Sequence, residues 1–225
     1  MTKYYQDEDY LAMVKCLHPQ ERIFYGNFKF TKRQSSYLLG RLTAKRAIAA
    51  LTGEAVLDRI LIEQGFFNQP VVSRPEQNIQ VSITHCGNLG GALAFPEVCP
   101  MGIDIETIDY SKVKVLETQI TSGENEILAS LGQTYVRGLT IIWTAKEALS
   151  KVLKTGLLTP LYIFEMDTIF VDKQGEVIGY FKNFPQYQAK FFYGKTYVCA
   201  IVYPKKTELN FISGNSQQRF LILDD

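Results

Sequence analysis

The chain has 225 residues, 46% of them apolar and 12% aromatic, so it can bury a sizeable core as one large domain or two smaller lobes. Its formal net charge of +1 provides no whole-molecule field of the kind that attracts nucleic acid.

The cysteines and the hydrophobic runs indicate the compartment. No C-x-x-C pair occurs, which favours reduced thiols over a disulfide framework or a zinc site; the cysteines are Cys16, Cys86, Cys99 and Cys199. The opening run MTKYYQDEDYLAMVKC lacks the charged-then-apolar pattern of a signal peptide. No apolar run approaches the roughly 20 residues that span a bilayer. We therefore expect a soluble cytoplasmic protein.

The first half of the chain is predicted to begin with a helix and to continue in strands. An apolar stripe predicts a helix over residues 34–52, with Gly53 as its stop. Apolar alternation then predicts strands at residues 56–64, 69–72, 78–86 and 90–95. The segment Arg22 to Arg46 contains seven basic residues and no acidic one. It is either a solvated helix face or a landing site for a phosphorylated ligand.

The second half repeats a helical portion and a group of strands. Pro96 and Pro100 precede a strand at 101–106, and a capping box formed by Thr121 and Glu124 predicts a helix over 121–131. A longer helix is expected over 138–156, followed by a strand meander at 162–172, 176–181, 188–194 and 196–203. We expect an α+β protein with an N-terminal half at 1–100 and a C-terminal half at 101–225, although no sequence repeat is strong enough to prove duplication.

Two carboxylates, Asp104 and Glu106, stand one residue apart in an otherwise apolar strand, MGIDIETID. Side chains at i and i+2 share one face, so repulsion would oppose ionisation of both. A divalent cation removes that cost, and oxygen ligands suit Mg²⁺, which shares its shell with water and substrate phosphates. The alternative is an exposed strand edge with solvated acids.

Two further segments are candidates for phosphate chemistry. Within the helix expected over 138–156, the side chains of Trp143, Glu147 and Lys151 fall on one arc, together with Lys154. This places a third carboxylate beside a lysine, or it is an ordinary surface Glu–Lys pair. The run ITHC ends a strand, and Thr84 and His85 can donate to an anion, although a lone histidine is more often structural.

The motifs V-S-I-T-H-C, G-I-D-I-E and W-T-A-K-E-A-L-S-K, in this order, resemble the 4′-phosphopantetheinyl transferase superfamily. The similarity extends to YLLGRLTAKRA and TYVCAIV, and it covers most of residues 17–203. The spacing and the chain length resemble the larger, monomeric class of that family. The resemblance implies two similar α/β half-domains related by pseudo-two-fold symmetry, with the active site between them.

The resemblance also implies an activity and its residues. Members of the family transfer the phosphopantetheine arm of coenzyme A to a serine of an apo acyl or peptidyl carrier protein and release 3′,5′-ADP. By motif, the Mg²⁺ ligands would be Asp104, Glu106 and Glu147. The catalytic groups would be Glu147, as the base directly or through water, and Lys151, which would also meet the pyrophosphate. The remaining coenzyme A contacts would come from Arg41, Lys45, Thr84 and His85.

The chain departs from the family pattern at two positions that are often basic. The run Asn68-Gln69-Pro70 stands where many members have Gly-Lys/Arg-Pro, and Gln34-Ser35-Ser36 stands where an arginine is common. Either coenzyme A binding is weaker, or the charge is supplied by Lys32, Arg33 or Arg74. Two other readings stay open: a non-catalytic module that binds coenzyme A or a carrier, and a magnesium phosphohydrolase that needs no carrier.

Overall fold

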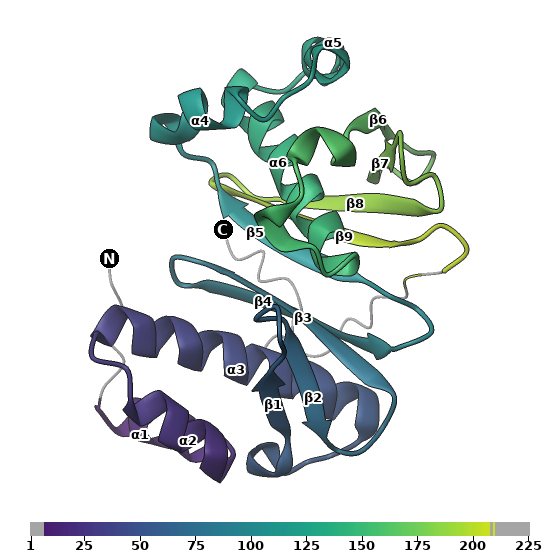
Figure 1. Ribbon diagram of the computed structural model, residues 1–225. Helices are drawn as coiled ribbons and strands as arrows, with labels where there is room; N and C mark the ends of the chain where they lie inside the picture. Colours follow the sequence, from purple (N-terminus) through teal and green to yellow (C-terminus); the bar gives the residue numbers. More distant parts are fainter. Residues whose placement is uncertain (1–6, 208, 210–225) are drawn as a thin grey trace. The chain divides into compact units, whose positions relative to one another are not determined.

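The computed structural model describes residues 7–207 and residue 209. The chain divides between Glu97 and Val98 into two compact units, which we call unit 1 and unit 2 (Figure 1). Both units combine helices with antiparallel strands, as the α+β prediction requires. Within the described residues, no helix is both long enough and apolar enough to cross a membrane.

Unit 1 is built around one long helix packed on a β-hairpin. Its elements are α1 (Asp7–Lys15), α2 (Pro19–Gly26), α3 (Thr31–Thr52), the 3-10 helix η1 (Leu57–Arg59), β1 (Leu61–Gln64), β2 (Pro70–Arg74), β3 (Ile79–Cys86) and β4 (Leu89–Pro96). Strand β1 pairs with β2, and β3 pairs with β4, both antiparallel. The core joins α3 to these strands through Ala44, Ile48 and Val81, among others. Helix α3 ends where Gly53 adopts φ +79°, as its sequence predicts.

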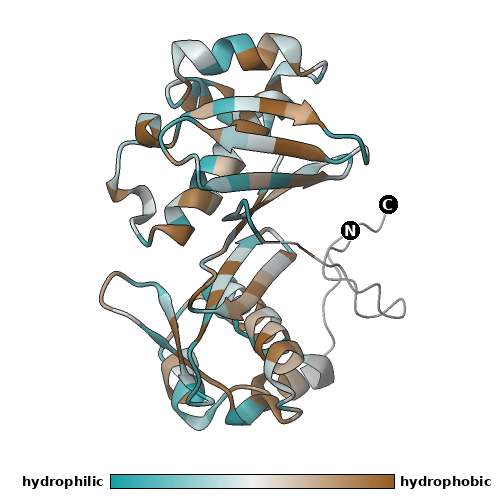
Figure 2. Ribbon diagram, turned by 90° about the vertical axis from the view of Figure 1, so that its right-hand side faces the viewer, coloured by the Kyte–Doolittle hydropathy of each residue, from teal (hydrophilic) through white to brown (hydrophobic). Residues whose placement is uncertain are grey.

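Unit 2 is a five-stranded antiparallel sheet covered by a helix. Its elements are β5 (Gly102–Thr107), η2 (Tyr110–Lys112), α4 (Val113–Glu117), α5 (Ser122–Ser130), α6 (Tyr135–Val152), η3 (Gly156–Leu158), η4 (Leu161–Phe164), β6 (Met166–Val171), β7 (Val177–Phe181), β8 (Tyr187–Tyr193) and β9 (Tyr197–Pro204). The strand order is β5-β9-β8-β7-β6. Apolar residues run along these strands (Figure 2), and those facing α6 form the core of the unit.

Several elements differ from the sequence prediction, among them the strand expected at 162–172, whose first part is the 3-10 helix η4. The short helices α1, α2 and α4 were not predicted, and the first part of the strand expected at 56–64 is the 3-10 helix η1. Helix α2 begins without a Ser, Thr, Asp or Asn at its N-cap. The N-cap is His18, whose ring accepts a hydrogen bond from Gln20 N. In contrast, the predicted capping box of Thr121 and Glu124 is confirmed at the start of α5.

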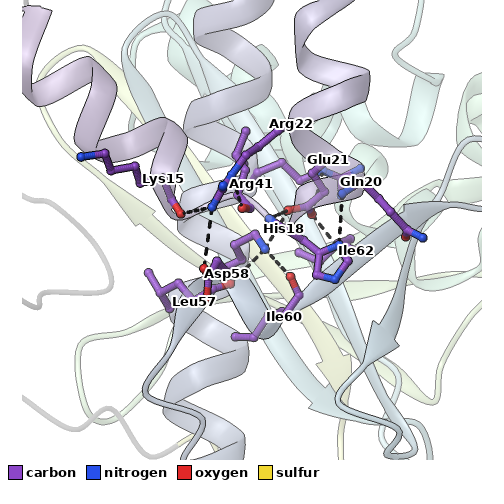
Figure 3. A network of polar contacts seen from close by, with 12 residues as sticks. Lys15, His18, Gln20, Glu21, Arg22, Arg41, Leu57, Asp58, Ile60 and Ile62 are labelled. Carbon is purple, nitrogen blue, oxygen red and sulfur yellow. Dashed lines mark hydrogen bonds and ion pairs between the residues drawn. The ribbon is translucent and has the colours of Figure 1, made fainter.

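A buried glutamate holds the elements of unit 1 together. Glu21, at the third position of α2, accepts hydrogen bonds from the backbone of His18 and of Ile62 in β1. Its carboxylate lies 2.7 Å from the ammonium of Lys45 on α3, which has no exposed surface (Figure 3). One carboxylate therefore ties α2, α3 and β1 to one another.

Unit 2 contains the same arrangement. Glu124, at the third position of α5, accepts hydrogen bonds from the backbone of Thr121 and of Met166 in β6. Its carboxylate lies 2.6 Å from the ammonium of Lys146 on α6, and neither side chain is exposed. In both units a capping glutamate thus joins a short helix to the long helix and to the strand that follows it.

Candidate functional site

The two carboxylates of β5 face the helix side of the unit 2 sheet. Asp104 is paired with Ala200, and Glu106 with Val198, whose side chains belong to the core beneath α6. Asp104 is only 4% exposed. The alternation predicted from the sequence therefore places both carboxylates on one face, next to α6.

Helix α6 presents its functional side chains along one stripe. Between residues 138 and 150, only Trp143 and Glu147 are not buried. One turn further, the ammonium of Lys151 lies 2.7 Å from Asp104 Oδ1 and donates to the carbonyl of Ile103. This stripe contains Trp143, Glu147 and Lys151, as the sequence predicted, but Lys154 lies beyond the end of α6 at Val152 with φ +56° and is not part of it.

Asp104, Glu106 and Lys151 all act on the charge of Glu147. The pKa of Glu147 is raised to about 7, mainly by burial and also by the charges of Asp104 and Glu106, while Lys151 acts in the opposite direction. A cation, Lys112, also lies 3.0 Å from Glu106 Oε2, a contact that sequence reasoning missed. The result is a partly dry acid cluster beside two lysines.

Gly102 allows α6 to come close enough to β5 to form this cluster. A Cβ atom built on Gly102 would lie 2.2 Å from the carbonyl oxygen of Ala148 and 2.9 Å from the side chain of Val152. No side chain fits there without moving the helix backbone. The glycine of G-I-D-I-E thus sets the spacing between the strand that bears Asp104 and the helix that bears Glu147.

The chemistry of these donors suits a hard cation. The cluster offers carboxylate oxygens only, which is the ligand type that Mg²⁺ prefers. Among the described residues, no three His, Cys, Asp or Glu side chains form a preformed metal cage. Mg²⁺ is commonly held by one or two carboxylates, water and substrate phosphates, so the set suits an ion shared with a pyrophosphate.

A groove of about 700 Å³ lies in unit 1, between α3 and the strands. Its lining includes Arg41 and His85, two of the predicted coenzyme A contacts. His85 and Ile83 lie on the face of β3 that approaches Gly40 of α3. Thr84, the neighbour of His85, is buried and does not line the groove, since alternate strand residues point to opposite faces.

Lys45 does not reach the groove. Its ammonium donates to the carbonyls of Leu57 and Ile60 and pairs with Glu21 (Figure 3). This placement favours an internal, structural role over the ligand contact predicted for it. Arg41 differs, because its guanidinium lies over the ring of Tyr37 at 5.0 Å while Nε approaches Glu21 at 3.8 Å.

The groove also contains residues that the motifs did not single out. Its aromatic lining comes from α2, α3 and the loop between them, namely Phe24, Phe28, Phe30 and Tyr37. Lys32 and Arg33 line it too. The basic segment from Arg22 to Arg46 pointed to these two residues, but the sequence alone did not show which of its cations line the groove.

The chain is similar in sequence to members of one protein family. Residues 100–202 match the family model described as the 4′-phosphopantetheinyl transferase superfamily. Enterobactin synthase component D of Escherichia coli (strain K12) is 31% identical over 127 residues, which cover 53% of this chain and 54% of that protein. L-aminoadipate-semialdehyde dehydrogenase-phosphopantetheinyl transferase is 24% identical over 163 residues in Xenopus laevis (66% of this chain, 53% of that protein) and 24% over 173 residues in Mus musculus (71% and 55%).

The chain spans about half the length of the curated relatives it matches. The model match covers β5 and α6, which contain Asp104, Glu106, Glu147 and Lys151. The resemblance to the superfamily that the motifs suggested is thereby confirmed: the segment 100–202, which contains the acid cluster, matches the 4′-phosphopantetheinyl transferase superfamily.

Proposed function

We propose that the protein transfers the phosphopantetheine arm of coenzyme A to a serine of an apo acyl or peptidyl carrier protein and releases 3′,5′-ADP. The observation that carries the proposal is the cluster of Asp104, Glu106 and Glu147 beside Lys151 in unit 2. Similarity to proteins named as phosphopantetheinyl transferases supports this kind of reaction.

The residues of the cluster divide the chemistry between them. The serine oxygen forms a bond to phosphorus while the bond to 3′,5′-ADP breaks, and Glu147 takes the serine proton directly or through water. Without the ion, the pKa of Glu147 is raised to about 7, which makes it a stronger base than an ordinary glutamate, whereas direct coordination of Mg²⁺ would lower that basicity. Lys151 offsets negative charge on the leaving group, as cationic side chains do in phosphoryl transfer.

We propose Mg²⁺ as the metal of this reaction, held by Asp104, Glu106 and Glu147. The bound ion would neutralise charge on the pyrophosphate of coenzyme A. In this role Asp104 would contact both the ion and Lys151, because its Oδ1 already accepts a hydrogen bond from Lys151. The strand fixes Asp104, so Lys151 and the ion are expected to share it.

We also propose that the two units are copies of one α/β unit, as the family resemblance implies. The matching contacts of Glu21 with Lys45 and of Glu124 with Lys146 support this. Unit 1 would then bind the nucleotide end of coenzyme A through Arg41 and His85.

We further propose that the protein acts as a monomer in the cytoplasm.

The experiment that tests the function is carrier loading followed by mass spectrometry. The full chain is mixed with coenzyme A, Mg²⁺ and an apo carrier protein, with and without a chelator. A mass gain of one phosphopantetheine arm that the chelator abolishes supports the proposal. Release of 3′,5′-ADP without a carrier supports a phosphohydrolase instead. No gain on several carriers, with coenzyme A still bound, supports a non-catalytic module.

A further inference from the structure

We infer that Lys32 and Arg33, at the start of α3, bind the phosphates at the nucleotide end of coenzyme A in the unit 1 groove, together with Arg41. The inference rests on the proposed function and assigns residues to it that none of the motifs contains. All the residues concerned lie in unit 1.

One face of α3 supplies the wall of the groove. Arg33, Tyr37 and Gly40 are separated by four and three residues, and Ser36 and Arg41 lie beside them, so these positions follow one side of the helix. All five line the groove, and Lys32 joins them from the first turn. Gly40 leaves room for Ile83 and His85 on the opposite wall, because a Cβ there would lie 3.3 Å from Ile83.

Aromatic rings hold the two guanidinium groups of this wall in place. Arg33 lies over the ring of Phe28 at 5.1 Å, and Arg41 lies over the ring of Tyr37 at 5.0 Å. Phe28 and Tyr37 contact each other, with ring centroids 5.3 Å apart. A ring beneath a guanidinium restrains it by cation–π attraction, while its N–H groups, which point outward in the plane of the guanidinium, can donate to a phosphate. Exposed aromatic rings beside them suit a nucleobase.

The two basic positions that the sequence lacks do not supply charge in the structure. Gln69 turns back onto its own hairpin, where its Oε1 accepts from Phe67 N at 2.9 Å, and it does not line the groove. Gln34 is turned away likewise, since its amide donates to the carbonyl of Phe28. Arg74 is also absent from the lining. Of the three replacements suggested by the sequence, only Lys32 and Arg33 reach the groove.

The other cations of the basic segment are either occupied inside unit 1 or lie outside the groove. Arg22 donates to the carbonyls of Leu17 and Lys15, and Lys45 is buried against Glu21. Lys29 and Arg46 are exposed and do not line the groove. This second pair gives a matched control, because it removes the same charge from the same segment.

The test is the binding of adenosine 3′,5′-bisphosphate to the full chain, measured by isothermal titration calorimetry. The double variant K32Q/R33Q is compared with K29Q/R46Q, and circular dichroism verifies that both are folded. We expect K32Q/R33Q to weaken binding about tenfold or more, since charge-assisted contacts to phosphate are lost. K29Q/R46Q should change the dissociation constant less than about twofold, because exposed charges outside the site are screened.

Carrier loading supplies the second readout. K32Q/R33Q should raise KM for coenzyme A and leave kcat nearly unchanged, as expected when contacts made equally in the ground and transition states are removed. Equal weakening by both double variants, or no weakening by either, overturns the inference. If the wild-type chain loads carriers and K32Q/R33Q keeps the same KM, the inference fails and the proposed function stands. If no carrier is loaded but bisphosphate binding still depends on Lys32 and Arg33, the function fails and the site stands.

Discussion

The ammonium of Lys146 lies 2.6 Å from a carboxylate oxygen of Glu124, and neither side chain has any exposed surface. Burial lowers the pKa of Lys146, and the hydrogen bond to Glu124 opposes this effect. Lys146 also donates to the carbonyl of Gln119, and Glu124 accepts from the backbone of β6. Lys146, which precedes the proposed base Glu147, therefore connects α6 to α5 and, through Glu124, to the sheet.

Replacing Lys146 by methionine should destabilise unit 2 strongly. The substitution leaves the carboxylate of Glu124 buried without a cation, which costs roughly 3–5 kcal/mol. The double variant K146M/E124Q should recover part of this loss, because a glutamine is neutral and still accepts from the backbone. Denaturant unfolding measures both. K182A, which breaks an ion pair whose lysine is 59% exposed, is the control and should change the unfolding free energy by less than about 1 kcal/mol. Equal losses in K146M and K182A would contradict the prediction.

Asp104→Asn should abolish most of the magnesium-dependent transfer. Asparagine keeps the volume of the side chain but removes the charge that holds the ion, so we expect kcat/KM to fall on the order of 100-fold. Carrier loading at several Mg²⁺ concentrations measures the effect. Asp167, an exposed residue of β6, offers the control D167N. Full magnesium-dependent activity in D104N, or in Asp104→Ala, would remove Asp104 from the metal site.

Lys151→Ala should lower turnover more than it lowers stability. The ammonium lies beside Asp104 but is partly exposed, with 27% of its side chain accessible, so we expect the protein to stay folded at 25 °C. The loss of transition-state stabilisation should appear in kcat, on the order of 100-fold. Steady-state kinetics and unfolding curves are recorded on the same samples. If the remaining turnover only follows the folded fraction, Lys151 acts through its ion pair with Asp104 on stability and not on catalysis.

Gly102→Ala should separate β5 from α6. The new Cβ would meet the carbonyl oxygen of Ala148, which is backbone and cannot rotate away, so the helix must move at a cost of about 1–3 kcal/mol or more. Thermal unfolding measures this cost, and transfer should fall as well because Asp104 and Glu147 move apart. Gly26→Ala is the matched control, since a Cβ at Gly26 has no neighbour within 4 Å. A melting temperature of G102A equal to that of G26A would refute the prediction.

The contribution of Glu165 to the free energy of unfolding should depend on pH. The hydroxyl of Thr121, and then Lys182, hold the pKa of Glu165 below its usual 4.5. The folded pKa is lower than the unfolded one, so the stabilisation is present above about pH 4.5 and is lost as the pH falls through the folded pKa. The difference in unfolding free energy between the wild type and E165Q should therefore shrink on acidification. A difference that stays constant from neutral to acidic pH would disprove this.

The parts of the fold that depend on local patterns could be predicted from the sequence. Alternation placed Asp104 and Glu106 on one face of a strand, and helical spacing placed Trp143, Glu147 and Lys151 on one stripe of α6. The same alternation would have separated Thr84 from His85, since neighbours in a strand point to opposite faces. These features need only the backbone period and no knowledge of distant partners.

The remaining features depend on contacts between distant parts of the chain. The burial of Lys45 follows from Glu21 and from the carbonyl of Ile60, and neither is marked as a lysine partner by the sequence. The pairing of β5 with β9 joins segments about 95 residues apart, which no local pattern specifies. The closeness of Gly102 to Ala148 likewise becomes evident only when the helix lies on the sheet.

The matching carboxylate–lysine pairs show how little sequence the proposed duplication would need to preserve. The backbone donor in the strand follows the capping glutamate by 41 residues in unit 1 and by 42 in unit 2. Only the two charged partners need to be kept, because the N-cap and the strand donor contribute backbone groups that almost any residue provides. The N-cap is a histidine in unit 1 and a threonine in unit 2. Two residue types at a fixed spacing are therefore all that each unit needs in order to tie its short helix, long helix and strand together.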